Sequence, residues 1–159
     1  MKRLIVFSIL MFSVILLAEK PFQIGLFNPV QLQNEGESIK GVKLNFIHSK
    51  NANVTGFDFG LVSEVSSDFT GLQMNTISYN RGNSTGVQMG LAFIGISISD
   101  NMTGLQLNTV NYTAKQMTGL QFGLINVVKG GGANFQIGLI NYNKNSTIFF
   151  LLPFINFNL

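Results

Sequence analysis

The sequence predicts an all-β chain of repeated strands, and three features carry that prediction. A seven-residue motif occurs seven times, at intervals of 15 residues except for one interval of 18. Apolar and polar residues alternate within each copy, which is the two-residue period of a half-buried strand. A leading glycine in six of the seven copies argues against a helix over the same residues. The copies begin at Gly41, Gly56, Gly71, Gly86, Gly104, Gly119 and Asn134, and a fainter copy begins at Pro21.

The residue two places after the leading position is polar in every copy and is glutamine in five of the seven. Its two neighbours are always apolar, as Leu105 and Leu107 are around Gln106. We therefore expect the apolar side chains to lie against lipid or a core, and the glutamines to form a structural belt of hydrogen-bonded amides on the opposite face. The apolar contacts are expected at Leu72, Leu105 and Leu120, opposite Gln73, Gln106 and Gln121.

The fourth residue after the leading position is asparagine or glycine in all seven copies. These are the two residues that adopt the left-handed αL conformation at low cost, so the position predicts a β-bulge or a bend. A bulge would also explain why the apolar residues change phase after it. The residues concerned are Asn45, Gly60, Asn75, Gly90, Asn108, Gly123 and Gly138.

A second period of 30 residues overlies the first. Asparagine and glycine alternate at the fourth position, tyrosine occurs in alternate copies, and basic turns alternate with mostly acidic ones. Identical coils of 15 residues predict no such alternation. We therefore predict antiparallel strands that close as a small up-and-down barrel or meander, with a two-sheet β-solenoid of 30-residue coils as the alternative. The alternating apolar residues of 149–159 favour the barrel, because outer-membrane barrels carry strands of this kind.

The first residues predict export. Met1-Lys-Arg is followed by an apolar run over Leu4–Leu17 and by Ala18, which is the layout of a signal peptide spanning 1–18. The run is shorter than the roughly 20 residues of a membrane-spanning helix, and a retained anchor is the alternative. Residues 19–159 are expected to form a single β-repeat domain. The chain has no cysteine, so repeat stacking or sheet closure must hold this domain together.

No constellation of residues points to a reaction. His48 is the only histidine, and in a chain without cysteine neither a zinc site nor a Ser-His-Asp arrangement is supported. We therefore assign no catalytic, cofactor-binding or metal-binding residue, and expect a protein that is not an enzyme and needs no cofactor. The net charge is +3, but the ten basic residues form no cluster, which argues against nucleic acid as a partner.

The repeat region resembles one known group of sequences. Phe27–Leu32, Gly41–Ile47 and Gly56–Val62, followed by Gly-Leu-Gln-x-Gly-Leu-x-Asn copies and the closing Leu152–Phe157, are similar to the bacterial surface repeat-containing proteins of spirochaetes. The resemblance implies export and a surface address, and brings no assigned reaction. The expected function is a structural or interaction role at the outer membrane or cell surface, with the outer membrane as a partner. The alternative is a secreted or surface-tethered β-solenoid that binds a partner through its Gln/Asn-rich face.

Overall fold

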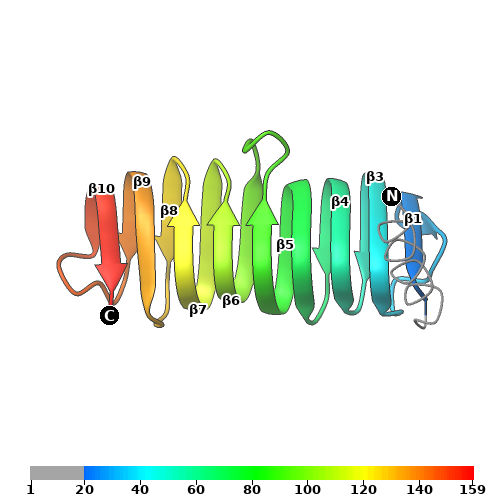
Figure 1. The fold of residues 1–159 in the computed structure, drawn as a ribbon, viewed down its shortest axis with the longest axis horizontal. Helices are drawn as coiled ribbons and strands as arrows, with labels where there is room; N and C mark the ends of the chain where they lie inside the picture. The colour runs from blue at the N-terminus through cyan, green and yellow to red at the C-terminus, as the bar shows by residue number, and fades with distance from the viewer. Residues whose placement is uncertain (1–19) are drawn as a thin grey trace, which may run out of the picture.

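The computed structural model describes residues 20–159, which form one β-sheet wound into a solenoid (Figure 1). The predicted signal segment, 1–18, lies outside the described residues. Ten strands follow one another along the stack, in the order β10-β9-β8-β7-β6-β5-β4-β3-β1-β2. The strands are β1 (Phe22–Phe27), β2 (Val30–Gln31), β3 (Ile39–Asn51), β4 (Val54–Val65), β5 (Phe69–Met89), β6 (Ile96–Leu107), β7 (Val110–Phe122), β8 (Ile125–Val128), β9 (Asn134–Asn143) and β10 (Leu151–Asn158).

Each coil of the solenoid contains one copy of the motif. Gly41 of β3 pairs with Gly56 of β4, which pairs with Gly71 of β5, so the chain returns to the same point after each copy. Every pairing from β3 to β9 is parallel. The predicted antiparallel barrel or meander is therefore wrong, because parallel neighbours need a full circuit of chain between them. The alternative of a β-solenoid is confirmed, but its coil has 15 residues, with one copy of the motif, and not 30.

The leading glycine forms a corner of each coil. The angle φ is +127° at Gly104, and it is positive at the leading glycine of all six copies that have one. A Cβ atom at Gly104 would lie 2.1 Å from the carbonyl oxygen of Gly86 in the preceding coil. Residues with a side chain seldom adopt this conformation. The corner therefore needs glycine for two reasons, the backbone conformation and the close approach of stacked coils.

The alternation of asparagine and glycine at the fourth position has a packing cause. A Cβ atom at Gly60 would lie 2.5 Å from Cβ of Asn45 and 1.9 Å from its carbonyl oxygen. Asn45 in one coil is thus followed by Gly60 in the next, so coils of 15 residues can give a 30-residue period. Across Gly60, Asn45 Nδ2 lies 3.4 Å from Asn75 Oδ1. The predicted αL conformation is wrong, since Gly60 alone among the seven fourth-position residues has a positive φ, and its value of +155° is far from αL. A bulge or similar irregularity is present in one coil, because the β3–β4 pairing changes register between Asn45 and His48.

A second corner of the coil explains why the apolar residues change phase after the fourth position. The fifth and sixth residues of a copy, such as Leu124 and Ile125, are both exposed, and Asn126 after them is buried. The longer interval between two copies is taken up by the loop 90–95, which projects from the upper side of the stack in Figure 1. Beyond this loop Ile96 pairs with Ile77, so the coils resume their alignment.

The interior of the solenoid is mostly polar. Its buried apolar side chains form two small clusters, Ile39, Val54, Val65 and Phe69 in one and Met102, Met117 and Val128 in the other. The other buried side chains are mainly glutamine, asparagine and serine, at or near zero exposure. Buried polar groups are costly unless they are hydrogen-bonded, so the interior has to be held by side-chain hydrogen bonds between coils.

Short strands cover both ends of the stack. Strand β1 is parallel to β3, with Phe22 opposite Val42, so the faint early copy is a genuine first coil. Strand β2 then folds back antiparallel on β1. At the other end, β10 pairs with β9 in the antiparallel direction and closes the chain.

Candidate functional site

The glutamine row forms a hydrogen-bonded ladder inside the solenoid. Each amide nitrogen donates to the amide oxygen of the glutamine in the preceding coil, at distances between 2.7 and 3.0 Å. Because every amide points the same way, the bonds polarise one another along the ladder. The expected belt of structural amides is therefore present, but in the core. Its members are Gln136, Gln121, Gln106, Gln88 and Gln73, all fully buried.

An asparagine ladder runs through the same interior with the opposite polarity. Asn111 Nδ2 donates to Asn126 Oδ1, and Asn126 Nδ2 donates to Asn141 Oδ1, each at 2.8 Å. These amides donate toward the C-terminal end of the stack, whereas the glutamine amides donate toward the N-terminal end. The dipoles of the two ladders therefore oppose each other, which limits the electrostatic cost of burying them in a medium of low dielectric constant.

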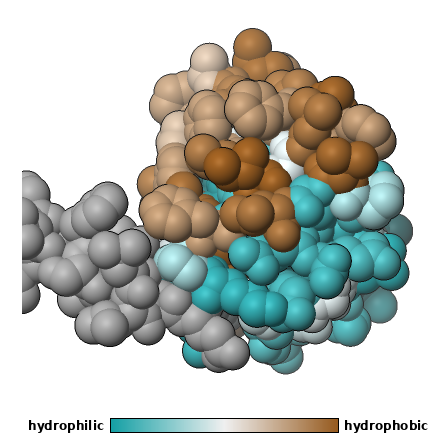
Figure 2. All heavy atoms as spheres, turned by 90° about the vertical axis from the view of Figure 1, so that its right-hand side faces the viewer, coloured by the Kyte–Doolittle hydropathy of each residue, from teal (hydrophilic) through white to brown (hydrophobic). Residues whose placement is uncertain are grey.

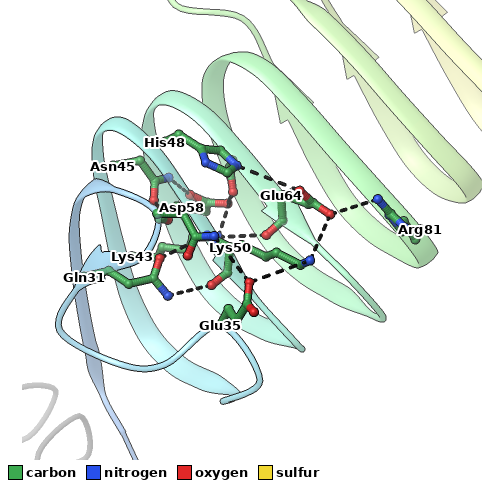
Figure 3. Close-up of polar contacts among 12 residues, drawn as sticks. Gln31, Glu35, Lys43, Asn45, His48, Lys50, Asp58, Glu64 and Arg81 are labelled. Carbon is green, nitrogen blue, oxygen red and sulfur yellow. Dashed lines mark hydrogen bonds and ion pairs between the residues drawn. The ribbon is translucent and has the colours of Figure 1, made fainter.

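The glutamine ladder ends on a buried charged pair (Figure 3). Gln73 Nε2 donates to Asp58 Oδ2 at 2.8 Å, and Lys43 lies opposite Asp58 in the preceding coil. Asp58 also accepts hydrogen bonds from Asn45 Nδ2 at 2.6 Å and from Ser63 Oγ at 2.5 Å. Lys43 Nζ donates to Ser63 Oγ at 2.9 Å. Three coils are thus joined through one carboxylate.

Burial lowers the pKa of Lys43, while the negative charges of Asp58 and Glu64 act to raise it. A buried amine beside a carboxylate is a common feature of active sites. Here, however, Lys43 and Asp58 have no exposed surface, so a substrate cannot contact either group while the coils are closed. The geometry is that of a polar link between neighbouring coils.

His48 belongs to a partly exposed network that meets the buried one at Glu64, whose carbonyl oxygen accepts a hydrogen bond from Lys43 Nζ at 3.2 Å. Its Nε2 lies 3.9 Å from Glu64 Oε2, and Glu64 Oε1 lies 3.2 Å from Arg81 and 3.7 Å from Lys50. The Arg81 guanidinium also lies 5.2 Å from the centre of the Tyr79 ring. Such partly exposed ion pairs contribute little to stability. Within residues 20–159, no three His, Cys, Asp or Glu side chains are grouped as metal ligands would be.

One side of the solenoid exposes apolar side chains, which occupy the upper part of the end-on view in Figure 2. We call this surface the apolar face and define it as the first, third, fifth and sixth residues after the leading position of each copy. These rows contain no Asp, Glu, Lys or Arg in any of the seven copies. None of the elements formed by residues 20–159 is a helix that could cross a bilayer. Strongly exposed members of the apolar face are Phe46, Leu61, Phe122, Leu124 and Leu139.

The structure confirms two opposite faces and excludes a core for the leucine row, because the glutamines and not the leucines are buried. Leu105 and Gln106 do lie on opposite faces, but the leucine is 37% exposed and the glutamine is 0% exposed. The other glutamines of the ladder are also fully buried, so these amides are not accessible to a partner. Binding of a partner by the β-solenoid stays a prediction. The apolar face is the accessible one. The sequence could have indicated this, because its polar row consists of amides, which can be buried when they form hydrogen bonds with one another.

Comparison with known proteins adds no family to this description. No protein-family model matches the chain, and no curated protein or solved structure matches it either. The resemblance to spirochaetal surface repeat proteins therefore stays an expectation. Function has to be argued from the interior ladders and the apolar face.

Proposed function

We propose that this chain is an exported, non-enzymatic β-solenoid that attaches to a lipid surface through its apolar face. The observation that carries the proposal is the absence of Asp, Glu, Lys and Arg from all four outward rows. Soluble monomers seldom expose contiguous apolar patches larger than a few hundred Å². Large apolar side chains are exposed here along the whole stack, from Phe22 to Ile155. Covering such a surface is favourable by roughly 25 cal/mol per Å² of apolar area.

The border of the apolar face has the composition of a membrane interface. Tyr79, Tyr112 and Tyr142 occupy equivalent positions in alternate coils, two residues beyond the sixth-position row. A basic residue follows each tyrosine within three positions, namely Arg81, Lys115 and Lys144. Tyrosine is enriched at membrane–water interfaces, and basic residues beside it attract anionic headgroups.

The chemistry of the apolar face favours lipid over a protein partner. A specific protein interface carries about one hydrogen bond per 100–200 Å² of buried area. The apolar face offers few side chains that could form such bonds, because its four rows are almost entirely aliphatic, aromatic or methionine. The amide side chains of the glutamine and asparagine ladders are instead directed inward and bonded to neighbouring coils, which suits a protein that lies against hydrocarbon.

Flotation of the exported chain with vesicles of phosphatidylcholine and phosphatidylglycerol tests the proposal. The wild type should float with the vesicles. A Phe46→Gln/Phe59→Gln/Leu61→Gln variant should bind at least about tenfold more weakly, since burying each such side chain contributes about 1.5–3 kcal/mol. Circular dichroism checks that this variant is folded.

A matched control replaces three exposed threonines of the opposite, polar surface. Thr70→Gln/Thr85→Gln/Thr103→Gln should float like the wild type. A wild-type chain that stays in the soluble fraction as a monomer would overturn the proposal. A soluble oligomer in which the apolar face is buried would also overturn it, and would show that the face binds further copies of the chain and not lipid.

Export is a separate part of the proposal, supported by the apolar run Leu4–Leu17 and by the resemblance to surface repeat proteins. Mass spectrometry of the protein recovered from the cell envelope should show a chain that begins near Glu19. Recovery of an intact Met1 would contradict cleavage of the signal segment and favour the retained anchor.

A further inference from the structure

A groove crosses the apolar face near the C-terminal end of the stack. It has a volume of about 510 Å³, within the range of about 300–1,000 Å³ that is usual for small-molecule sites. Leu107, Phe122 and Ile137 from three successive coils line it, together with Leu124 and Leu139. Gly123 and Gly138 also lie along it.

The groove also includes two phenylalanines from outside the regular coils. Phe93 belongs to the projecting loop 90–95, and Phe154 belongs to β10. Both have a positive φ, +64° and +67°, which is rare for a bulky side chain. Both are also strongly exposed, at 64% and 68%. Strained backbone of this kind is concentrated at functional sites, so these two departures from the repeat mark the groove as a built feature.

The groove offers a peptide almost no free hydrogen-bond donors or acceptors from side chains. Its two polar side chains are Asn108 and Thr109. Asn108 Nδ2 already donates to Asn111 Oδ1 at 2.9 Å and to the carbonyl oxygen of Gln88 at 3.3 Å. Thr109 Oγ1 is engaged with the loop, 3.4 Å from the amide nitrogen of Gly95 and 3.5 Å from the carbonyl oxygen of Phe93. A peptide backbone placed here would leave its own polar groups unpaired, at a substantial cost.

We infer that this groove binds a single hydrocarbon chain, the acyl chain of a lipid or fatty acid. The inference rests on the proposed attachment to lipid, because the groove is continuous with the apolar face that attachment uses. A hydrocarbon chain needs no hydrogen-bond partner in the groove, and its carboxylate or headgroup remains in water. The two phenylalanines contact the acyl chain beside the leucines of the floor.

Titration with dansyl-undecanoic acid, below its micelle-forming concentration, tests this site. We expect one bound probe per chain, with a blue-shifted and enhanced emission, and displacement by unlabelled oleate. Leu124→Gln/Leu139→Gln should weaken probe binding by about tenfold or more, because both side chains would lose apolar contact with the ligand. Leu61→Gln is the matched control, since it changes the same row of the apolar face outside the groove and should leave probe affinity unchanged.

The two proposals fail in distinguishable ways. Vesicle flotation without saturable probe binding would overturn the acyl site and leave the lipid attachment standing. Probe binding that Leu124→Gln/Leu139→Gln does not weaken would also overturn it, by placing the ligand elsewhere. Saturable binding at the groove by a chain that never floats would support the acyl site and overturn the attachment.

Discussion

Gln73 donates its amide hydrogen to the carboxylate of Asp58 in the preceding coil, at 2.8 Å. At this contact a ladder of neutral amides meets a buried negative charge. Lys43 occupies the equivalent buried position in the coil before Asp58, and it supplies the compensating positive charge. The stability of the N-terminal coils therefore depends on a pair of charges that the other coils lack.

Asp58→Asn should destabilise the fold by about 3–5 kcal/mol, because it removes the more strongly interacting of the two negative charges that compensate the buried Lys43. The double variant Lys43→Gln/Asp58→Gln should recover most of that loss, since it extends the glutamine ladder by two rungs. Urea unfolding followed by circular dichroism measures both. Equal losses in the single and double variants would show that the two charges are not coupled.

The lowered pKa of Lys43 gives a pH dependence of defined sign. The folded protein holds this proton less tightly than the unfolded chain does, so protonated Lys43 opposes folding. This destabilising effect decreases as the pH rises toward 10.5, the pKa of the lysine in the unfolded chain. The free energy of unfolding of the wild type, relative to Lys43→Gln, should therefore increase as the pH rises toward 10.5. Lys129→Gln, at an exposed position, controls for the loss of one surface charge, and a constant or decreasing difference would contradict the assignment.

The inverted faces predict that Gln106→Asp is more harmful to folding than Leu105→Asp. The first variant buries an uncompensated charge inside the ladder, whereas the second places it on the accessible side. We expect the first to cost about 3 kcal/mol more. Thermal unfolding in detergent-free buffer measures the difference. The opposite order would mean that the leucines form the interior.

Gly104→Ala should be strongly destabilising, because its φ is +127° and its new Cβ would lie 2.1 Å from the Gly86 carbonyl oxygen. The conformational strain alone is worth about 1–3 kcal/mol. Gly36→Ala is the matched control, since a Cβ atom there would have no neighbouring atom within 4 Å and its φ is not in the restricted range. We expect the control to change stability by less than about 0.5 kcal/mol. Similar melting temperatures for the two variants would show that the corner does not require glycine at position 104.

The repeat predicted the strands and their spacing, but not how the chain winds. The alternation of Asn45 and Gly60 has the same period whether two short coils or one long coil produce it. Only the close approach of the stacked backbones distinguishes the two cases. Likewise, Gln106 between two leucines establishes two faces without saying which one is inside. That choice depends on hydrogen bonds to Gln88 and Gln121, which come from other coils. The groove involves Phe93 and Phe154, which lie outside the repeat and so carry no periodic signal.

The charged rung has a further consequence for how the chain finds its fold. Five glutamine rungs are chemically interchangeable, so a chain wound one coil out of step would still pair most of them. Only Lys43 and Asp58 differ from the rest, and a slip would leave the carboxylate beside a neutral amide and the amine without a counter-ion. Buried polar groups are best known for specifying alignment at some cost in stability. We therefore expect Lys43 and Asp58 to fix the register in which the coils stack during folding.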